Sequence, residues 1–135
     1  MLWVGLFFPS LPLDVFARAS DASDAAQPFI VTSGGHYPRV GTANAAARAA
    51  GIRRDQLVSA ALALAPDVAM RERDVAAEEA ALADIATLVL AFTPDVALAP
   101  PCAIVAEIAG SARLFGDLSR LVEHIHRTVR SCGYD

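Results

Sequence analysis

The sequence predicts a single α+β domain, and three observations support this class. The chain has 135 residues, of which 55% are hydrophobic, so it can bury a sizeable core. Short apolar runs that tolerate β-structure alternate with longer segments whose apolar residues recur at helical spacing. Proline, glycine and small polar residues separate these segments, as is typical of turns. We therefore expect one folded unit rather than a disordered linker.

The first half of the chain predicts short strands and Ala-rich helices. A strand is expected near 2–8 and a short helix near 12–19, followed by a polar loop at 20–27. Residues 28–32 are predicted to pair with 37–40 across a turn whose two glycines tolerate positive φ. The remaining elements of this half are helices near 42–50 and 55–65 and a short strand near 68–71.

A long helix is predicted from Asp74 to Phe92. Asp74 is a suitable N-cap, and Glu78 and Glu79 would favour the positive end of the helix dipole. The apolar residues that recur at helical spacing are Leu82, Ile85, Leu88, Val89 and Phe92. This stripe is expected to pack on a sheet.

The last third predicts two strands and a helix. Val96 and Leu98 alternate with small residues, a Pro-Pro pair follows, and residues 103–108 are apolar apart from Glu107. The Gly-Ser pair at 110–111 is expected to end the second strand. A final amphipathic helix is predicted near 117–131, with Asp117 as its N-cap.

Residues 92–116 resemble the palm motif of the Y-family translesion DNA polymerases. In that family a Ser/Thr-Pro-x-Val-Glu strand precedes the motif Ser-Ile-Asp-Glu-Ala-Tyr-Leu-Asp-x-Thr-Gly. Residues 93–96, Thr-Pro-Asp-Val, match the approach strand, and the motif falls on 100–110 without a gap. The two adjacent acids that hold magnesium in the family then fall on Cys102 and Ala103. Alanine has no donor atom, and a cysteine sulfur is too soft for magnesium.

A second block resembles the fingers segment of the same family. Residues 42–52 are Thr-Ala-Asn-Ala-Ala-Ala-Arg-Ala-Ala-Gly-Ile, where the family has Asn-Tyr-Glu-Ala-Arg-x-x-Gly-Ile, and the spacing to Pro66 also agrees. The resemblance places Arg48 on the arginine that contacts the incoming triphosphate, while the accompanying tyrosine becomes Ala45. An arginine fork can pair two phosphate oxygens, but Arg48 could equally be an ordinary surface cation.

The N-terminal strand completes the resemblance. The family has an acid at its end, whereas this chain has Phe7 there and no acid before Asp14, so all three metal positions lack a carboxylate. With the Gly-Ser-Ala-Arg-Leu-Phe-Gly signature at 110–116, the chain is most similar to the ImuB-type subgroup. Those proteins are regarded as polymerase relatives that act as adaptors in a damage-inducible mutagenesis complex.

The resemblance implies a particular architecture. It predicts the Y-family palm, a ferredoxin-like βαββαβ sheet with helices on one face, with a small helical fingers insertion at about 41–72. Residues 1–135 would be a single incomplete, C-terminally truncated palm domain, because the chain stops where the last palm strand would begin. A sheet without that strand exposes unpaired backbone groups, so we expect the isolated chain to be marginally stable or to associate.

The resemblance also implies a function: a non-catalytic adaptor in DNA repair and damage-induced mutagenesis. Its expected partners are DNA, bound through regions beyond this chain, a replicative-type polymerase, a sliding clamp and an accessory protein. No cofactor is expected. Two alternatives remain, a non-functional remnant and an active, magnesium-dependent error-prone polymerase that uses Asp14, Asp95 or Glu107 as displaced acids.

Charge, cysteine and histidine content bear on nucleic-acid binding, cellular compartment and metal sites. The net charge of −4 argues against a broad duplex-binding surface. The arginines at 39, 48, 53 and 54 form either a local basic patch or solvated surface charges. Two cysteines without a metal or redox spacing suit a reducing cytoplasm, and no membrane segment is evident. His124 and His126 would point about 200° apart on a helix, so a shared metal is not expected.

Overall fold

The computed structural model describes residues 1–19 and 26–135 and divides the chain into two compact units. Unit 1 consists of Met1–Leu11 and Ala76–Asp135, and unit 2 of Pro12–Val75. Most of the polar loop predicted at 20–27 lies outside the described residues. The segment predicted to be fingers-like, about 41–72, lies within unit 2.

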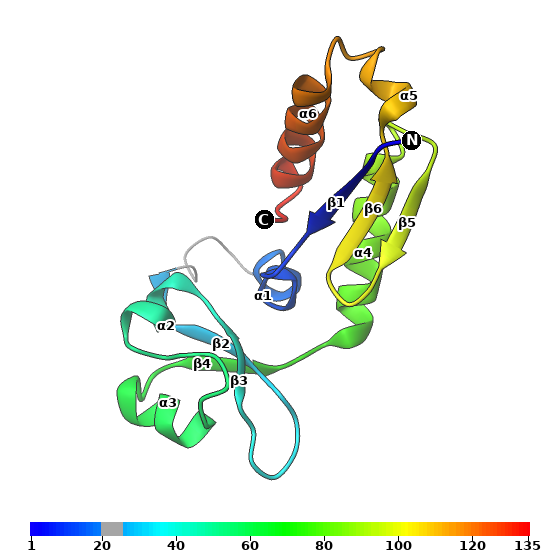
Figure 1. The fold of residues 1–135 in the computed structure, drawn as a ribbon. Helices are drawn as coiled ribbons and strands as arrows, with labels where there is room; N and C mark the ends of the chain where they lie inside the picture. The colour runs from blue at the N-terminus through cyan, green and yellow to red at the C-terminus, as the bar shows by residue number, and fades with distance from the viewer. Residues whose placement is uncertain (20–25) are drawn as a thin grey trace. The chain divides into compact units, whose positions relative to one another are not determined.

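Unit 1 is built on a three-stranded antiparallel sheet of order β1-β6-β5 (Figure 1). Its strands are β1 (Trp3–Phe7), β5 (Val96–Ala99) and β6 (Ala103–Glu107). The central strand β6 places Val105 opposite Gly5 on one side and Ala97 on the other. The three strands predicted for this part of the sequence are confirmed.

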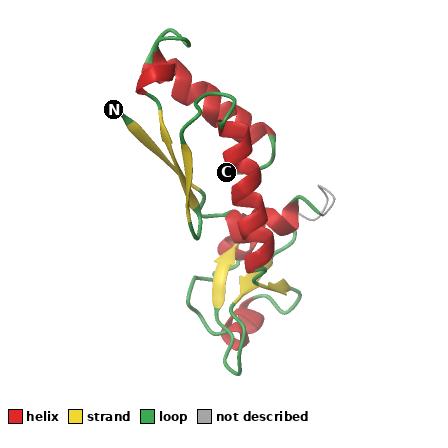
Figure 2. Cartoon of the chain, turned by 90° about the vertical axis from the view of Figure 1, so that its right-hand side faces the viewer, coloured by secondary structure: helices red, strands yellow, loops and turns green. Residues whose placement is uncertain are grey.

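The helices of unit 1 cover one face of this sheet. They are α4 (Val75–Val89), α5 (Ala109–Ala112) and α6 (Leu118–Ser131). Figure 2 shows the strands on one side and the two long helices on the other. The side chains buried in this unit include Leu82, Ile85, Val89, Ile104, Ala106, Leu121, Ile125 and Val129. Burying each large aliphatic side chain contributes about 1.5–3 kcal/mol, so the apolar stripes predicted from helical spacing stabilise the unit.

Helix boundaries in unit 1 follow local chemistry. Asp117 is the N-cap of α6, where its Oδ1 accepts the backbone N–H of Arg120 at 2.8 Å, as the sequence predicted. The predicted helix end at Phe92 is wrong, because α4 ends at Val89. The prediction that residues 110–111 simply end a strand is also wrong, since they lie inside the short helix α5.

Unit 2 contains a second three-stranded sheet of order β3-β2-β4. Its strands are β2 (Phe29–Thr32), β3 (Val40–Ala43) and β4 (Ala69–Glu72), and its helices are α2 (Ala45–Ala49) and α3 (Val58–Leu64). Helix α1 (Leu11–Ala17) begins at the boundary between the units. Strand β2 pairs with β3 antiparallel and with β4 parallel.

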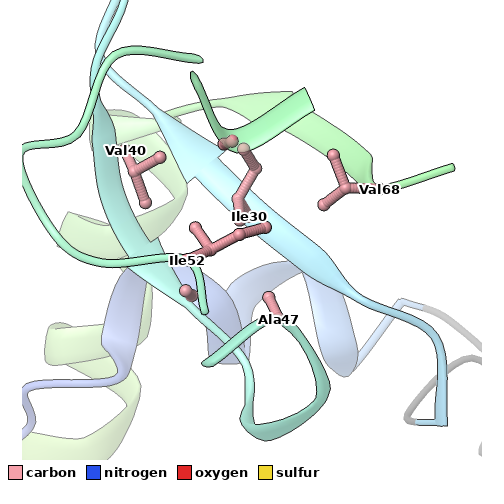
Figure 3. Packing of buried hydrophobic residues seen from close by; sticks show 7 residues of the cluster. Ile30, Val40, Ala47, Ile52 and Val68 are labelled. Atoms are coloured by element: carbon pink, nitrogen blue, oxygen red, sulfur yellow. The ribbon is translucent and has the colours of Figure 1, made fainter. Parts of the chain in front are cut away.

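The core of unit 2 explains where the predicted elements are displaced. Side chains from β2, β3, α2, α3 and the connecting segments meet in one apolar cluster (Figure 3), whose buried members are Ile30, Val40, Ala43, Ala47, Ile52, Ala61 and Val68. The strand predicted at 37–40 is wrong, because β3 runs over 40–43 and thereby buries Val40 and Ala43. The predicted helix starts at 42 and 55 are wrong as well. Residues 42–43 belong to β3, and Asp55 has φ 64°, which a helix interior excludes.

The side chain of Asn44 links two elements of unit 2. The Asn44 Oδ1 accepts the N–H of Ala47 at 2.9 Å, which caps α2, and the N–H of Phe29 at 3.0 Å, where β2 begins. The Asn44 Nδ2 donates to the carbonyl oxygen of Gln27 at 2.7 Å. Asn44 therefore positions the start of α2 against the start of β2.

None of the helices in the described parts of the chain is both long enough and apolar enough to cross a membrane.

Candidate functional site

The three positions where the resemblance places metal-binding acids lie together at one end of the β1–β6 ladder. Phe7 ends β1 and pairs directly with Ala103, which begins β6. The N–H of Phe8 donates to the carbonyl oxygen of Cys102 at 2.7 Å, which extends the ladder by one residue. Phe7 and Ala103 are therefore a non-hydrogen-bonded pair, the type whose Cα atoms lie closest, about 4.5 Å apart.

The side chains at this strand end do not fit magnesium. Phe7 is 66% exposed and Cys102 is half-buried, while Ala103 ends at its β-carbon. None of the three supplies the oxygen ligand that magnesium requires. Across residues 1–19 and 26–135, no three His, Cys, Asp or Glu side chains gather closely enough to hold a metal ion.

The sheet face around this strand end is largely apolar. Burial alternates along β1 and β6, so Ile104 and Ala106 are buried while their neighbours on β6 are more exposed. Trp3 and Phe7 stand two pleats apart on the more exposed face of β1. This face offers aromatic and aliphatic contacts at the strand end where the metal-binding acids of the resembled family are replaced.

Glu107 lies at the other end of β6, about 13 Å along the strand from Ala103. Its Oε1 accepts the N–H of Leu2 at 2.9 Å and the N–H of Ala109 at 3.1 Å. These bonds from Leu2 and then Ala109 lower the pKa of the Glu107 carboxyl below its usual value. The carboxylate thus fastens the N-terminus of the chain and the first turn of α5, a role that the sequence did not reveal.

Replacing Glu107 by Gln is expected to lower stability and to flatten its pH dependence. The pKa of Glu107 in the folded state is lowered from 4.5, so the carboxylate contributes its full share to the free energy of unfolding above that pH. This stabilisation is lost as the pH falls through the lowered pKa. Urea midpoints measured at pH 7 and pH 3.5 should therefore differ more for the wild type than for the variant. Glu123→Gln is the matched control, since Glu123 is an exposed acid that pairs with Arg127 on α6. Equal pH dependence in wild type and Glu107→Gln would contradict this role.

Asp95, another candidate displaced acid, also lies far from the Phe7–Ala103 strand end. Its carbonyl oxygen accepts the N–H of Glu107 at 2.9 Å, and β5 begins one residue later. The register pairs Val96 with Ala106 and Ala99 with Ala103, so Asp95 is at the Glu107 end of the sheet. Asp14 lies on α1, in unit 2.

Arg48, the candidate triphosphate contact, lies on α2 in unit 2. Its Nη1 donates to the carbonyl oxygen of Ala43, at the end of β3. In the described parts of the chain no carboxylate pairs with its guanidinium, so its other donors remain available. Ala45, which replaces the expected tyrosine, stands in the first turn of the same helix and adds no polar group.

Thr42 is a polar residue of this region that the sequence did not single out. Its Oγ1 is buried and has no hydrogen-bond partner among the described residues. A buried hydroxyl without a partner is unusual and costs about 1–3 kcal/mol. Thr42 immediately precedes Ala43, the residue whose carbonyl oxygen accepts a hydrogen bond from the Arg48 Nη1. The signal that could have identified Thr42 is its place at the start of the fingers-like block.

Both His124 and His126 are exposed, and the His124 ring lies beside Phe115, with centroids 6.1 Å apart. The i,i+4 pair between Arg127 and Glu123 is present at 3.1 Å. An exposed pair of this kind contributes only a few tenths of a kcal/mol, about 0.3–0.5.

Comparison with known proteins supports the resemblance. The model of the impB/mucB/samB family matches residues 13–133. No curated protein matches the chain.

Solved structures show the same fold. The insertion ternary complex of Dbh DNA polymerase has a TM-score of 0.80 at 17% identity, covering 97% of this chain and 39% of that chain. DinB from Sulfolobus solfataricus has a TM-score of 0.74 at 17% identity, with coverages of 95% and 37%. A Y-family DNA polymerase chimera has a TM-score of 0.75 at 17% identity, with coverages of 95% and 38%. The predicted α+β palm fold is confirmed, and the chain spans less than two fifths of these structures.

Proposed function

The chain belongs to the impB/mucB/samB family, and from this premise we propose that it is a non-catalytic relative of the Y-family polymerases that acts as an adaptor in DNA repair and damage-induced mutagenesis. One observation carries the proposal. Phe7, Cys102 and Ala103 meet at one strand end, and none of them offers an oxygen ligand. The scaffold of a two-metal nucleotidyl transferase is present without the carboxylates that such chemistry needs.

Displaced acids do not compensate for this loss. Glu107 and Asp95 lie together at the opposite end of the sheet, and the Glu107 carboxylate is engaged by two backbone N–H groups. Moving either acid to Ala103 would require breaking the β5–β6 register. The alternative of an active polymerase therefore has little support in unit 1.

Arg48 is the residue that supports a phosphate-binding role on the fingers side. It is exposed, and only one hydrogen bond of its guanidinium, to the Ala43 carbonyl oxygen, is made within the described residues. We infer that Arg48 can contact an anionic group such as a nucleotide phosphate without reacting with it. An adaptor that binds but does not transfer nucleotides fits this combination.

The partners proposed for the adaptor are DNA, a replicative-type polymerase, a sliding clamp and an accessory protein. This set of partners follows from the resemblance of the chain to the ImuB-type subgroup. Contacts with them would involve regions beyond residues 1–135, because the chain spans under two fifths of the polymerases that share its fold. The proposed setting is the cytoplasm, where a damage-inducible complex would assemble.

Primer extension tests the absence of catalysis. We expect the chain, and the full product of its gene, to add no nucleotide to a primed template with Mg²⁺ or Mn²⁺, whether or not the template carries a lesion. Dbh DNA polymerase serves as the active control. Metal-dependent extension above a protein-free blank, abolished by Glu107→Gln, would refute the proposal in favour of the active alternative.

A gene-deletion experiment distinguishes the adaptor proposal from the alternative of a non-functional remnant. Deleting the gene should lower damage-induced mutation frequency, and a copy carrying Cys102→Ala should restore it, because the position has no catalytic task. An unchanged mutation frequency after deletion would instead identify a non-functional remnant.

A further inference from the structure

Strand β1 forms one edge of the unit 1 sheet, and among the described residues only β6 pairs with it (Figure 1). The N–H of Phe8 donates to the carbonyl oxygen of Cys102. The carbonyl oxygen of Leu2 accepts the N–H of Ile108, so the even-numbered residues of β1 face β6. The backbone N–H and C=O groups of the odd-numbered residues therefore point to the open edge, where a further strand can bind them. These residues are Trp3, Gly5 and Phe7.

The other strand edges that the structure describes carry features that oppose a further strand. A proline pair directly follows β5. In unit 2, residues 55–56 form hydrogen bonds with the outer edge of β3 at Val40. Strand β4 carries Arg71 and Glu72. Proline, charge and covering loops are the means by which proteins keep strand edges from pairing, and β1, with the sequence Trp-Val-Gly-Leu-Phe, has no charge and no proline.

The sequence of β1 is complementary to itself in antiparallel pairing. From either end it runs aromatic, aliphatic, glycine, aliphatic, aromatic, with Gly5 at the centre. A second copy placed antiparallel about Gly5 brings Trp3 opposite the second Phe7, and Val4 opposite the second Leu6. The outward N–H and C=O groups of each β1 then meet those of the other copy, with about six hydrogen bonds across the edge. This is a two-fold interface, in which both copies use the same surface.

The open face of β1 suits this pairing. Trp3 is 49% exposed and Phe7 is 66% exposed, so both rings have surface left to bury. A β-carbon added at Gly5 would meet no atom within 4 Å, so the centre of the strand is unobstructed on this face. Each ring would lie directly opposite an aromatic ring of the second copy, and such cross-strand pairs stabilise sheets.

The helix-covered side of the same edge offers an apolar contact. Leu6 lines a small pocket together with Val129 and Tyr134, at the end of α6. In the antiparallel register, Val4 of the second copy lies opposite Leu6 and therefore beside this pocket. Non-hydrogen-bonded pairs bring side chains closest, so Val4 and Leu6 would pack against each other on this side.

We propose that two copies of this chain associate through β1, antiparallel about Gly5, and join their three-stranded sheets into one continuous sheet. Both ends of the joined sheet are then β5, whose edge is followed by the proline pair. Pairing consequently stops at two copies and does not continue into a filament. The inference goes beyond the proposed function and does not depend on it.

Analytical ultracentrifugation of residues 1–135 over a dilution series tests the association. We expect the wild type to sediment as a dimer that dissociates on dilution, and Gly5→Pro to remain a monomer wherever the wild type is dimeric. Proline fits this position, because the Gly5 N–H points away from β6 and its surroundings are open. Trp3→Lys should also weaken the dimer. Leu98→Lys is the matched control, since Leu98 lies on β5 and is likewise 49% exposed, and it should leave the dimer unchanged.

Two double variants test the register. Trp3→Lys with Phe7→Glu places a lysine opposite a glutamate at both ends of the paired strands, whereas Trp3→Lys with Phe7→Lys places lysine opposite lysine. We expect the lysine–glutamate variant to dimerise about 2- to 30-fold more tightly, the range expected from two cross-strand pairs. Net charge alone would favour the double-lysine variant, because the chain carries −4. Parallel pairing would give the lysine–glutamate variant no such advantage.

Four results would overturn the inference: a wild type that is monomeric at every concentration, a wild type that forms species larger than a dimer, a dimer that both Gly5→Pro and the double-lysine variant leave intact, or equal affinities of the two double variants. Circular dichroism establishes that each variant is folded, and the double variants decide the question if Gly5→Pro is not. The adaptor proposal is decided separately, by primer extension and gene deletion.

Discussion

Replacing Asn44 by Ala should destabilise unit 2 by about 2–4 kcal/mol. The substitution removes the cap of α2 and also leaves the N–H of Phe29 and the carbonyl oxygen of Gln27 without their partner. A helix cap alone is worth about 0.5–2 kcal/mol, and stranded backbone groups add to this cost. The measurement is a urea titration followed by far-UV circular dichroism, with the midpoint and the slope both recorded.

The Asn44 side chain stabilises unit 2 through hydrogen bonds that it accepts and one that it donates. A second variant distinguishes the two contributions. Asn44→Asp keeps an acceptor for Ala47 and Phe29 but loses the donor to Gln27, so it should cost less than Asn44→Ala. Ala63, an exposed position on α3, offers a control as Ala63→Ser. If Asn44→Ala unfolded at the same urea concentration as the wild type, the role of this side chain as the joint between β2 and α2 would be wrong.

Placing carboxylates at all three strand-end positions should create a magnesium site. The variant is Phe7→Asp with Cys102→Asp and Ala103→Glu, three positions whose backbones are neighbours because Phe7 pairs with Ala103 and the N–H of Phe8 donates to the carbonyl oxygen of Cys102. Without metal the three charges repel, so the thermal midpoint should fall. Magnesium should raise it again, with a stabilisation of about 2.7 kcal/mol at a concentration 100 times the Kd.

The matched controls separate charge from metal binding. The neutral variant with Asn, Asn and Gln at the same positions should show no response to magnesium, like the wild type. The double variant with acids only at Cys102 and Ala103 should respond more weakly, since the first-strand ligand is absent. A triple variant whose midpoint ignores magnesium would show that these positions do not converge as the register indicates.

Much of unit 1 could be predicted from sequence because its signals are local. The apolar spacing and the Asp117 cap define α6, and the alternation in β6 is strong enough to show which side chains are buried. The resemblance placed Phe7, Cys102 and Ala103 on the family's metal positions, and the structure brings the three to one strand end. Each of these features depends on residues close in sequence or on a recognisable motif.

The errors in unit 2 have a common physical cause. Residues 37–40 and 40–43 are both short segments that tolerate β-structure, and only packing distinguishes them. Register 40–43 buries Val40 and Ala43 beside Ile30, whereas 37–40 would bring an exposed tyrosine and a proline into the ladder. Asn44 is the N-cap of α2, so this helix begins at Ala45, after β3 has ended.

The sequence by itself determined the fold class, most elements of unit 1 and the absence of carboxylates at the three motif positions, since composition, periodicity and motif residues are local properties. Only the tertiary structure decided what the remaining polar groups do. It assigned Glu107 to two backbone N–H groups, left the Thr42 hydroxyl buried without a partner among the described residues, and bound Asp55 and Gln56 to the start of β3. These outcomes depend on which distant backbone groups become neighbours, and that is set by packing and strand register rather than by any single segment.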